Sequence, residues 1–267
     1  MIVIVGLGSI GVRHAKNLLD LGHTYLIGVD TRCYECVFDV PFPVYDSVES
    51  IDIERVTRAI ICTPPDLHHQ HAKQFVGRGI PTFIEKPMTT YAADASALCA
   101  TAHMNKSVLA VGYMERAHPT VQEAKEFIQK YGCQRASIGC YWLATDKTYA
   151  INEAEESSHA LDLALYLFGE SEVVEWEKHF LGDFRVETQH QSGTRCTIRM
   201  NMNEWWARRS IHLVSSDGQR KFSALYGENK AEWDECYRAE LRAFLNGKPL
   251  CTGEDGLRVV KILEELR

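Results

Sequence analysis

The fold is decided by the stretch IVIVGLGSIGVRHAKNLLDLG, residues 2–22. Its first four residues form a continuous apolar run, which is typical of a strand covered on both faces of a parallel sheet. Three glycines with GxGxxG spacing follow, and the rest has the pattern of a helix closed by a glycine. In this turn Gly6 permits the tight bend, Gly8 lets a pyrophosphate approach the backbone, and Gly11 lets helix and strand pack closely. The stretch therefore predicts the dinucleotide-binding turn of a doubly wound α/β sheet.

Strand and helix patterns continue to alternate up to residue 114, which predicts a Rossmann domain over residues 1–114. Beyond that point the strand patterns are grouped together, with three or four of them between Val173 and Phe222. Grouped strands predict a smaller α+β domain with a mainly antiparallel sheet over residues 115–267. Because no flexible linker separates the two, we expect a rigid interface with a cleft between them. After the first strand and helix, the further strands expected in the first domain are TYLIGVD (24–30), RAIICTPP (58–65), PTFIEKP (81–87) and SVLAVGY (107–113), and its further helices are 66–79 and 92–104. The helices expected in the second domain are HPTVQEAKEFIQKYG, SSHALDLALYLFG, 230–246 and 254–266.

The composition narrows the class of protein. The chain has 267 residues, a formal net charge of −7 and no run rich in lysine or arginine, which argues against nucleic acid or an anionic membrane as partner. The apolar runs are too short to span a membrane, and the chain enters a strand at once with no signal-peptide pattern. Nine scattered cysteines suit reduced thiols, so we expect a cytoplasmic protein without disulfides.

A carboxylate follows the second strand at the position that decides cofactor choice. Asp30 lies about twenty residues past the glycines, where it can accept hydrogen bonds from the adenosine ribose hydroxyls. It would repel a 2′-phosphate, so NAD is the expected cofactor. Arg32 can lie over the adenine or contact a phosphate, which keeps NADP as an alternative. A solvated turn is the other interpretation of both residues.

Two further strands bring polar residues to the same edge of the sheet. Thr63 and Pro64 follow the strand at 58–62, and Glu85 and Lys86 follow the next one, with Pro87 able to fix the turn through a cis bond. Ligands of open α/β sheets bind at the carboxyl ends of the strands. A lysine held there is expected to face the nicotinamide, although a lysine that merely ends a strand is the alternative.

The segment SSHALDLALYLFG predicts a buried helix, because it is apolar on nearly every face. Glu155, His159 and Asp162 follow i, i+4, i+7 spacing and share one face if the helix starts early enough. Buried polar groups are costly unless paired. They therefore either satisfy one another or line a cleft that faces Lys86.

The sequence gives weaker support to two other groups of residues that could bind a metal or act in redox chemistry. His68, His69 and His71 open a helix without a carboxylate or thiolate partner at ligand spacing, so a solvated or substrate-side role is favoured and no metal is expected. Cys33 and Cys36 have CxxC spacing without a second pair, and two ordinary thiols are the favoured interpretation.

The chain resembles the glucose-fructose oxidoreductase/inositol dehydrogenase (Gfo/Idh/MocA) family. The resemblance lies in GLGSIGVRH, Asp30, CTPPDLHHQHA, EKPMTT, VGYMERAHP and HALDLALYLFG, in the family's order. It implies a Rossmann domain, a second domain whose open sheet mediates homo-oligomers, and hydride transfer between nicotinamide and a sugar, polyol or related carbinol.

The resemblance also implies roles for single residues. Lys86 would contact the reacting oxygen and the nicotinamide ribose, and His159 would be the general acid/base. Glu155 stands where the family has an aspartate, and the chain is shorter than usual for the family. The catalytic candidates are Lys86, His159 and Glu155; the substrate-binding candidates are Lys86, Tyr113, Arg116, His159 and Asp162; and the cofactor-binding candidates are Gly6, Gly8, Ser9, Ile10, Gly11, Asp30, Arg32, Thr63, Pro64, His68, Glu85 and Lys86.

Two rival functions stay open at this point. One is a non-catalytic NAD-binding protein that regulates or docks a partner, for which the glutamate at 155 and the short second domain speak. The other is an epimerase or hydrolase in which NAD serves an internal oxidation and re-reduction. Neither rival predicts a nucleic-acid or membrane partner.

Overall fold

The computed structural model describes residues 1–33, 40–143, 153–178, 183–201, 203–226 and 230–266, without the side chains of 141–143, 153–156, 203–208, 226 and 230. The chain forms two compact units. The first comprises Met1–Met114 and Tyr237–Lys261, and the second comprises Glu115–Cys236 and Ile262–Arg267. The segment Tyr237–Lys261, expected in the second domain, thus returns to the first unit.

The first unit contains a six-stranded sheet in which all strands are parallel. Its strand order is β3-β2-β1-β4-β5-β6, so the sheet is doubly wound as the sequence predicts. Only β3, a pair of residues at the sheet's edge, escaped the sequence pattern because it is too short to show a period. The strands are β1 (Ile2–Val5), β2 (Leu26–Val29), β3 (Val44–Tyr45), β4 (Arg58–Ile61), β5 (Thr82–Glu85) and β6 (Leu109–Gly112).

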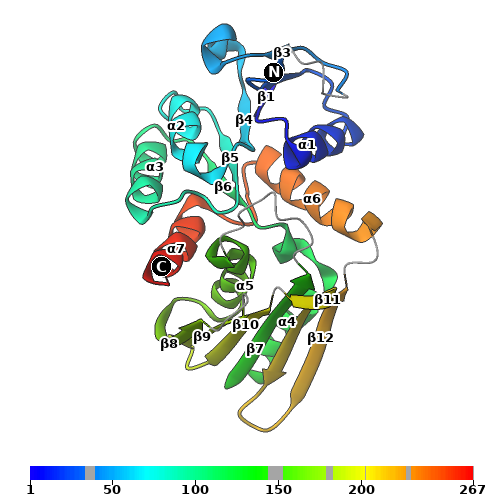
Figure 1. Cartoon of the computed structure of the whole chain (residues 1–267), viewed down its shortest axis with the longest axis vertical. Helices are drawn as coiled ribbons and strands as arrows, with labels where there is room; N and C mark the ends of the chain where they lie inside the picture. The colour runs from blue at the N-terminus through cyan, green and yellow to red at the C-terminus, as the bar shows by residue number, and fades with distance from the viewer. Residues whose placement is uncertain (34–39, 144–152, 179–182, 202, 227–229, 267) are drawn as a thin grey trace. The chain divides into compact units, whose positions relative to one another are not determined.

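Helices cover both faces of this sheet (Figure 1). α2 (Pro65–Val76) and α3 (Ala92–Met104) lie together on one face, and α1 (Ser9–Asp20) lies on the other beside α6 (Lys230–Leu245). The end of α6 belongs here because Leu241 and Phe244 pack into the apolar cluster around Ile4, Leu18 and Phe83. α7 (Gly253–Glu265) packs closely against β6, because a side chain at Gly253 would collide with Leu109. Burial of α6 against the sheet explains why the segment groups with the first unit.

The second unit is built on a six-stranded mixed sheet of order β12-β11-β7-β10-β9-β8. All neighbouring strands are antiparallel except β7 and β10, which confirms the predicted α+β class with a mainly antiparallel sheet. Five strands lie beyond residue 170, where three or four were expected. The elements are η4 (Met114–Ala117), α4 (Pro119–Tyr131), β7 (Arg135–Leu143), α5 (Glu153–Phe168), β8 (Ser171–Lys178), β9 (Asp183–His190), β10 (Arg195–Asn201), β11 (Asn203–Val214) and β12 (Arg220–Tyr226).

One face of this sheet forms the core of the second unit. Ile211, Ile138, Ile198 and Val186 stand side by side in register on four neighbouring strands, and all are buried. α5 contacts β7 and β10, so this row lies under it. The core therefore fixes α5, the helix that carries His159.

The described cysteines are all free thiols, as the sequence predicts, and Cys36 lies outside the described residues. None of the helices in the described part of the chain has both the length and the apolar character that a bilayer crossing requires.

Candidate active site

The glycine turn after β1 is shaped by close backbone packing. Gly6 has a φ of +89°, and a Cβ there would lie 2.7 Å from the backbone of Cys62. A Cβ on Gly11 would lie 2.0 Å from the Gly6 carbonyl oxygen, so helix and strand approach as predicted. By contrast, a Cβ on Gly8 would meet nothing within 4 Å. Gly8 caps α1 with no side-chain cap, and this open surface at a helix N-terminus fits a pyrophosphate.

Asp30 lies beside this turn and is already oriented toward it. Its Oδ2 accepts a hydrogen bond from Leu7 N at 2.9 Å, and its Oδ1 accepts one from Arg32 N at 3.0 Å. The exposed Arg32 guanidinium donates to the same carboxylate. Burial alone would raise the pKa of Asp30, but the hydrogen bonds from Arg32 and Leu7 outweigh it and lower the pKa. An ionised carboxylate fits the ribose hydroxyls of NAD.

The carboxyl ends of β4 and β5 meet at His68. This buried imidazole has Nε2 2.7 Å from the Thr63 carbonyl oxygen and Nδ1 2.9 Å from the Pro87 carbonyl oxygen. Burial lowers its pKa although the two carbonyls favour the charged ring. His68 thus ties the two loops together and is buried rather than solvated, while its predicted substrate-side role and contact with a cofactor stay predictions. Thr63 Oγ1 is buried and finds no hydrogen-bond partner among the described residues, so it is available to a ligand.

Lys86 directly follows β5 at the same edge, and the Lys86–Pro87 peptide bond is cis. Its N–H donates to Glu85 Oε2 at 3.1 Å. The Glu85 side chain turns into the interior, where Oε1 lies 2.6 Å from His14 Nε2. Glu85 therefore contacts both the loop after β5 and the core of the unit. Its predicted contact with a cofactor stays a prediction. The same holds for the exposed Ser9 and the partly buried Ile10 at the start of α1.

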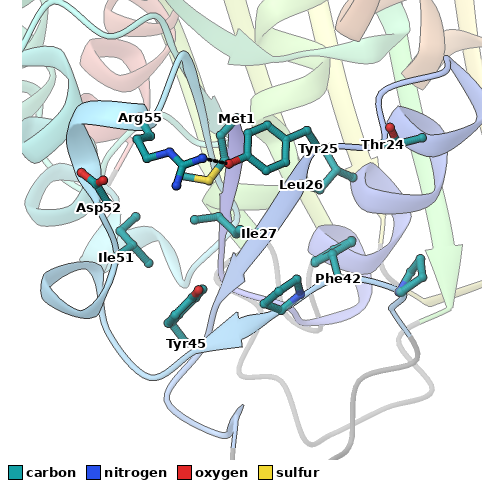
Figure 2. A pocket seen from close by; sticks show the side chains of 12 residues that line it. Met1, Thr24, Tyr25, Leu26, Ile27, Phe42, Tyr45, Ile51, Asp52 and Arg55 are labelled. Carbon is teal, nitrogen blue, oxygen red and sulfur yellow. Dashed lines mark hydrogen bonds between the residues drawn. The ribbon is translucent and has the colours of Figure 1, made fainter.

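A surface pocket of about 290 Å³ lies elsewhere on the first unit (Figure 2). It is lined beside the amino ends of β1 and β2 by residues such as Met1, Tyr25 and Phe42. Arg55 Nη2 donates to Tyr25 Oη across it at 2.6 Å. None of the predicted site residues lines this pocket.

In the second unit, the predicted substrate-binding residues Arg116 and Asp162 contact each other. Arg116 Nη2 lies 2.7 Å from Asp162 Oδ1, and Arg116 Nε lies 3.0 Å from Asp162 Oδ2. Both side chains are buried, and the guanidinium stacks over the Tyr166 ring. A buried bidentate pair of this kind holds η4 against α5. The structure gives the pair a positioning role, and its contact with a substrate stays a prediction.

His159 lies on the same helix and faces a carboxylate that the sequence analysis missed. Its Nδ1 is 3.5 Å from Glu115 Oε1, and both side chains are buried. Arg209 forms an ion pair with the same Glu115 oxygen. α5 does begin early enough to include Glu155, but the side chain of Glu155 lies outside the described residues. A signal for Glu115 was present, since an acidic residue preceded Arg116 in a segment expected to join the domains.

Tyr113 and Lys86 belong to the first unit, and His159, Arg116 and Asp162 belong to the second. Tyr113 is buried at the end of β6. The convergence of Lys86 and His159 on one substrate stays a prediction.

Comparison with known proteins agrees with the resemblance drawn from the motifs. Residues 1–113 match the Gfo/Idh/MocA family model, described as an oxidoreductase family with an NAD-binding Rossmann fold. This match covers the glycine turn, Asp30, Thr63, Pro64 and Lys86.

Two curated relatives are dehydrogenases. UDP-N-acetylglucosamine 3-dehydrogenase of Acidithiobacillus ferrooxidans is 28% identical over 127 residues, which is 46% of this chain and 40% of the relative. The chain thus aligns with less than half of that relative. The scyllo-inositol 2-dehydrogenase (NADP(+)) of Bacillus subtilis is 24% identical over 187 residues, 64% of this chain and 52% of the relative.

Solved structures support the fold over the whole chain. A probable dehydrogenase from Thermotoga maritima superposes with a TM-score of 0.86 at 20% identity, covering 100% of this chain and 97% of that one. A crystal structure of the A. ferrooxidans enzyme gives a TM-score of 0.82 at 20% identity and covers 100% and 96%.

Proposed function

We propose that this chain, whose residues 1–113 match the Gfo/Idh/MocA family of NAD-binding oxidoreductases, is a dehydrogenase acting on a CH–OH group of a sugar, polyol or sugar derivative. One observation carries the proposal. Lys86 follows β5 at the same sheet edge as the glycine turn and Asp30, where this fold binds nicotinamide cofactors.

NAD is the cofactor that these residues fit. Gly8 leaves the helix terminus open for the pyrophosphate, Asp30 is ionised for the ribose hydroxyls, and Thr63 Oγ1 is available for a further hydrogen bond. When bound, the nicotinamide supplies the hydride acceptor or donor. The carboxylate at 30 disfavours the extra phosphate of NADP, although Arg32 keeps NADP as the alternative.

The chain's own residues would handle the proton and the developing charge. Glu115 faces Nδ1 of His159, so we assign proton transfer to Nε2. In the oxidative direction Nε2 takes the hydroxyl proton, while the Lys86 ammonium stabilises the oxygen that loses it. Arg209 pairs with Glu115, and we infer that this carboxylate orients the imidazole. The orienting role that the resemblance implies for Glu155 stays a prediction beside it.

Within the sugar-like class, nucleotide sugars are the substrates to test first. The support is that UDP-N-acetylglucosamine 3-dehydrogenase appears both as a sequence relative and as a structural neighbour. Inositols are the second choice, from the B. subtilis relative.

We expect the protein to be a cytoplasmic homo-oligomer that uses the open face of the second sheet. Phe222 is exposed on that face beside His212, with ring centroids 4.4 Å apart. In register with Phe222 but four strands away, the Glu187 carboxylate pairs with Arg185 and Arg195. Light scattering of Phe222→Glu is expected to show smaller particles than wild type, whereas equal masses would assign the oligomer to another surface.

The activity is tested by following reduced-cofactor fluorescence. Purified protein with NAD is offered UDP-N-acetylglucosamine, scyllo-inositol, myo-inositol and simple sugars. The Lys86→Ala variant is expected to lose turnover about 100- to 1,000-fold while still binding NADH. NADH binding with no turnover on the whole panel would favour the non-catalytic rival, and cofactor retained through purification would favour the epimerase or hydrolase.

A further inference from the structure

The surface pocket of about 290 Å³ on the first unit has no part in the proposed reaction. It lies beside the amino ends of β1 and β2, whereas the glycine turn and Asp30 follow the carboxyl ends of these strands. Pockets that bind small molecules have volumes of about 300–1,000 Å³. This pocket is close to the lower limit of that range. It therefore has room for a ligand of amino-acid size rather than for a dinucleotide or a nucleotide sugar.

The lining of the pocket is largely apolar and includes aromatic rings. Ile27 and Ile51 are buried, and they line the pocket together with Tyr25, Phe42 and Tyr45. Tyr25 is 55% exposed and Tyr45 is 36% exposed, so the protein itself covers these two rings only in part. Open aromatic faces and edges favour contact with another ring. The apolar part of the pocket therefore suits an aromatic group.

Two opposite charges also line the pocket. Asp52 directly precedes the short turn η3 (Ile53–Arg55), and Arg55 ends it. In Figure 2 both side chains lie on one side of the pocket, with Phe42 on the opposite side. Within the described part of the chain, the two side chains do not form an ion pair with each other although they are three residues apart. The guanidinium and the carboxylate can therefore each bind a ligand group of opposite charge.

The Arg55 guanidinium is oriented by Tyr25. Its Nη2 donates to Tyr25 Oη at 2.6 Å, and its central carbon lies 5.9 Å from the centre of the tyrosine ring. A guanidinium has five N–H groups, so this bond leaves donors for a ligand. Carboxylates suit these donors best, because two parallel hydrogen bonds can form. The Asp52 carboxylate offers only acceptors, which suit an ammonium group.

We propose that this pocket is a binding site for a free aromatic α-amino acid. The carboxylate of the ligand pairs with Arg55, its ammonium group pairs with Asp52, and its ring packs against Phe42 and Tyr45. A single amino acid carries the two charges and the ring within the small volume available. The inference does not depend on the proposed function, because none of the cofactor or substrate candidates lines the pocket.

A ligand series on the wild-type protein tests the proposal without any variant. Isothermal titration calorimetry with L-phenylalanine, in the presence of saturating NADH, is expected to show one molecule bound per chain with a Kd of about 1 mM or tighter. Phenylalaninamide lacks the carboxylate and hydrocinnamate lacks the ammonium group, so each should bind about tenfold more weakly. L-Alanine lacks the ring and should also bind about tenfold more weakly. The absence of L-phenylalanine binding up to about 10 mM, or equal binding of all four compounds, would overturn the proposal.

Variants then show whether the two charges act as proposed. Arg55→Met should weaken L-phenylalanine binding about tenfold or more and leave phenylalaninamide binding unchanged, because the lost partner is that of the carboxylate. Asp52→Asn should weaken L-phenylalanine binding to a similar extent and leave hydrocinnamate binding unchanged. Both residues are exposed, so the variants should fold, and their Tm values check this.

Two matched controls lie outside the pocket. Arg78→Met and Glu54→Gln change exposed charged residues that do not line it, and both should bind L-phenylalanine as wild type does. Wild-type affinity for L-phenylalanine in folded Arg55→Met and Asp52→Asn would mean that the ligand binds elsewhere, and would overturn the proposal.

Discussion

Each unit buries a histidine against a glutamate, and the two pairs are held differently. In the first unit His14 Nε2 lies 2.6 Å from Glu85 Oε1. In the second unit His159 Nδ1 lies 3.5 Å from Glu115 Oε1, and Arg209 pairs with that same oxygen. The first contact is a short hydrogen bond, whereas in the second the carboxylate is shared between the imidazole and a guanidinium. The same two residue types thus form a tight hydrogen bond in one place, and in the other a looser contact to which we assign an acid/base role.

The largest expected effect tests the proposed catalytic role of His159. His159→Ala removes the proton acceptor and should lower kcat about 1,000-fold, within the range of general acid/base catalysis. NADH binding should remain, because the cofactor residues lie in the first unit. Steady-state fluorescence kinetics checks this, with the exposed His103→Ala as control. Near-normal turnover would end the assignment of His159.

The next prediction compares how much His14 and His159 each contribute to the stability of the protein. His14→Leu leaves the buried Glu85 without its hydrogen bond to His14 and should lower the free energy of unfolding by about 1–3 kcal/mol. His159→Leu should cost less, because Arg209 still pairs with Glu115. Urea unfolding of both variants measures the difference. Equal losses would mean that the two pairs are held alike.

The sequence predicted the first unit well because its constraints are local. The glycine spacing, Asp30 and the cis Lys86–Pro87 bond each depend on a few neighbouring residues, and the structure has all of them as expected. The return of Tyr237–Lys261 to the first unit was not predicted, because the core that α6 joins is decided by long-range contacts such as those of Leu241 and Phe244.

The partners of buried charges were harder to predict, because pairing depends on which elements meet. His14 was readable as buried, since Gly11, His14, Ala15 and Leu18 share one helical face and all are buried. Its partner Glu85 lies 71 residues further along the chain, at the end of β5. The sequence did not pair Arg116 with Asp162, although the structure does, and the expected grouping of Glu155, His159 and Asp162 stays a prediction.

A smaller effect is expected when the contact between His159 and Glu115 is weakened. Glu115→Gln keeps the shape of the side chain but removes the charge that orients His159, and should lower kcat about 10- to 100-fold. The matched control is Glu123→Gln on α4, an exposed glutamate whose carboxylate lies 3.1 Å from Lys221 Nζ. A fall in Tm at unchanged kcat would show that Glu115 is only structural.

The smallest expected effect is a pH dependence of stability that comes from the His14–Glu85 pair. Burial alone would raise the pKa of Glu85, but the hydrogen bond and charge of His14, with the Lys86 N–H, lower it from the ordinary value of 4.5. A carboxyl whose pKa is lower in the folded state stabilises the protein fully above about pH 4.5, and loses that contribution as pH falls through the folded value. Wild type should therefore lose stability more steeply below pH 4.5 than Glu85→Gln, by at most about 1.4 kcal/mol per pH unit. Urea unfolding between pH 3 and 7 compares the two slopes. The lowered pKa of Asp30 acts in the same direction and persists in the variant, so Asp30→Asn isolates its share. Parallel curves for wild type and Glu85→Gln would mean that the bond to His14 does not favour the ionised carboxylate, and the contrast between the two pairs would then rest on distance alone.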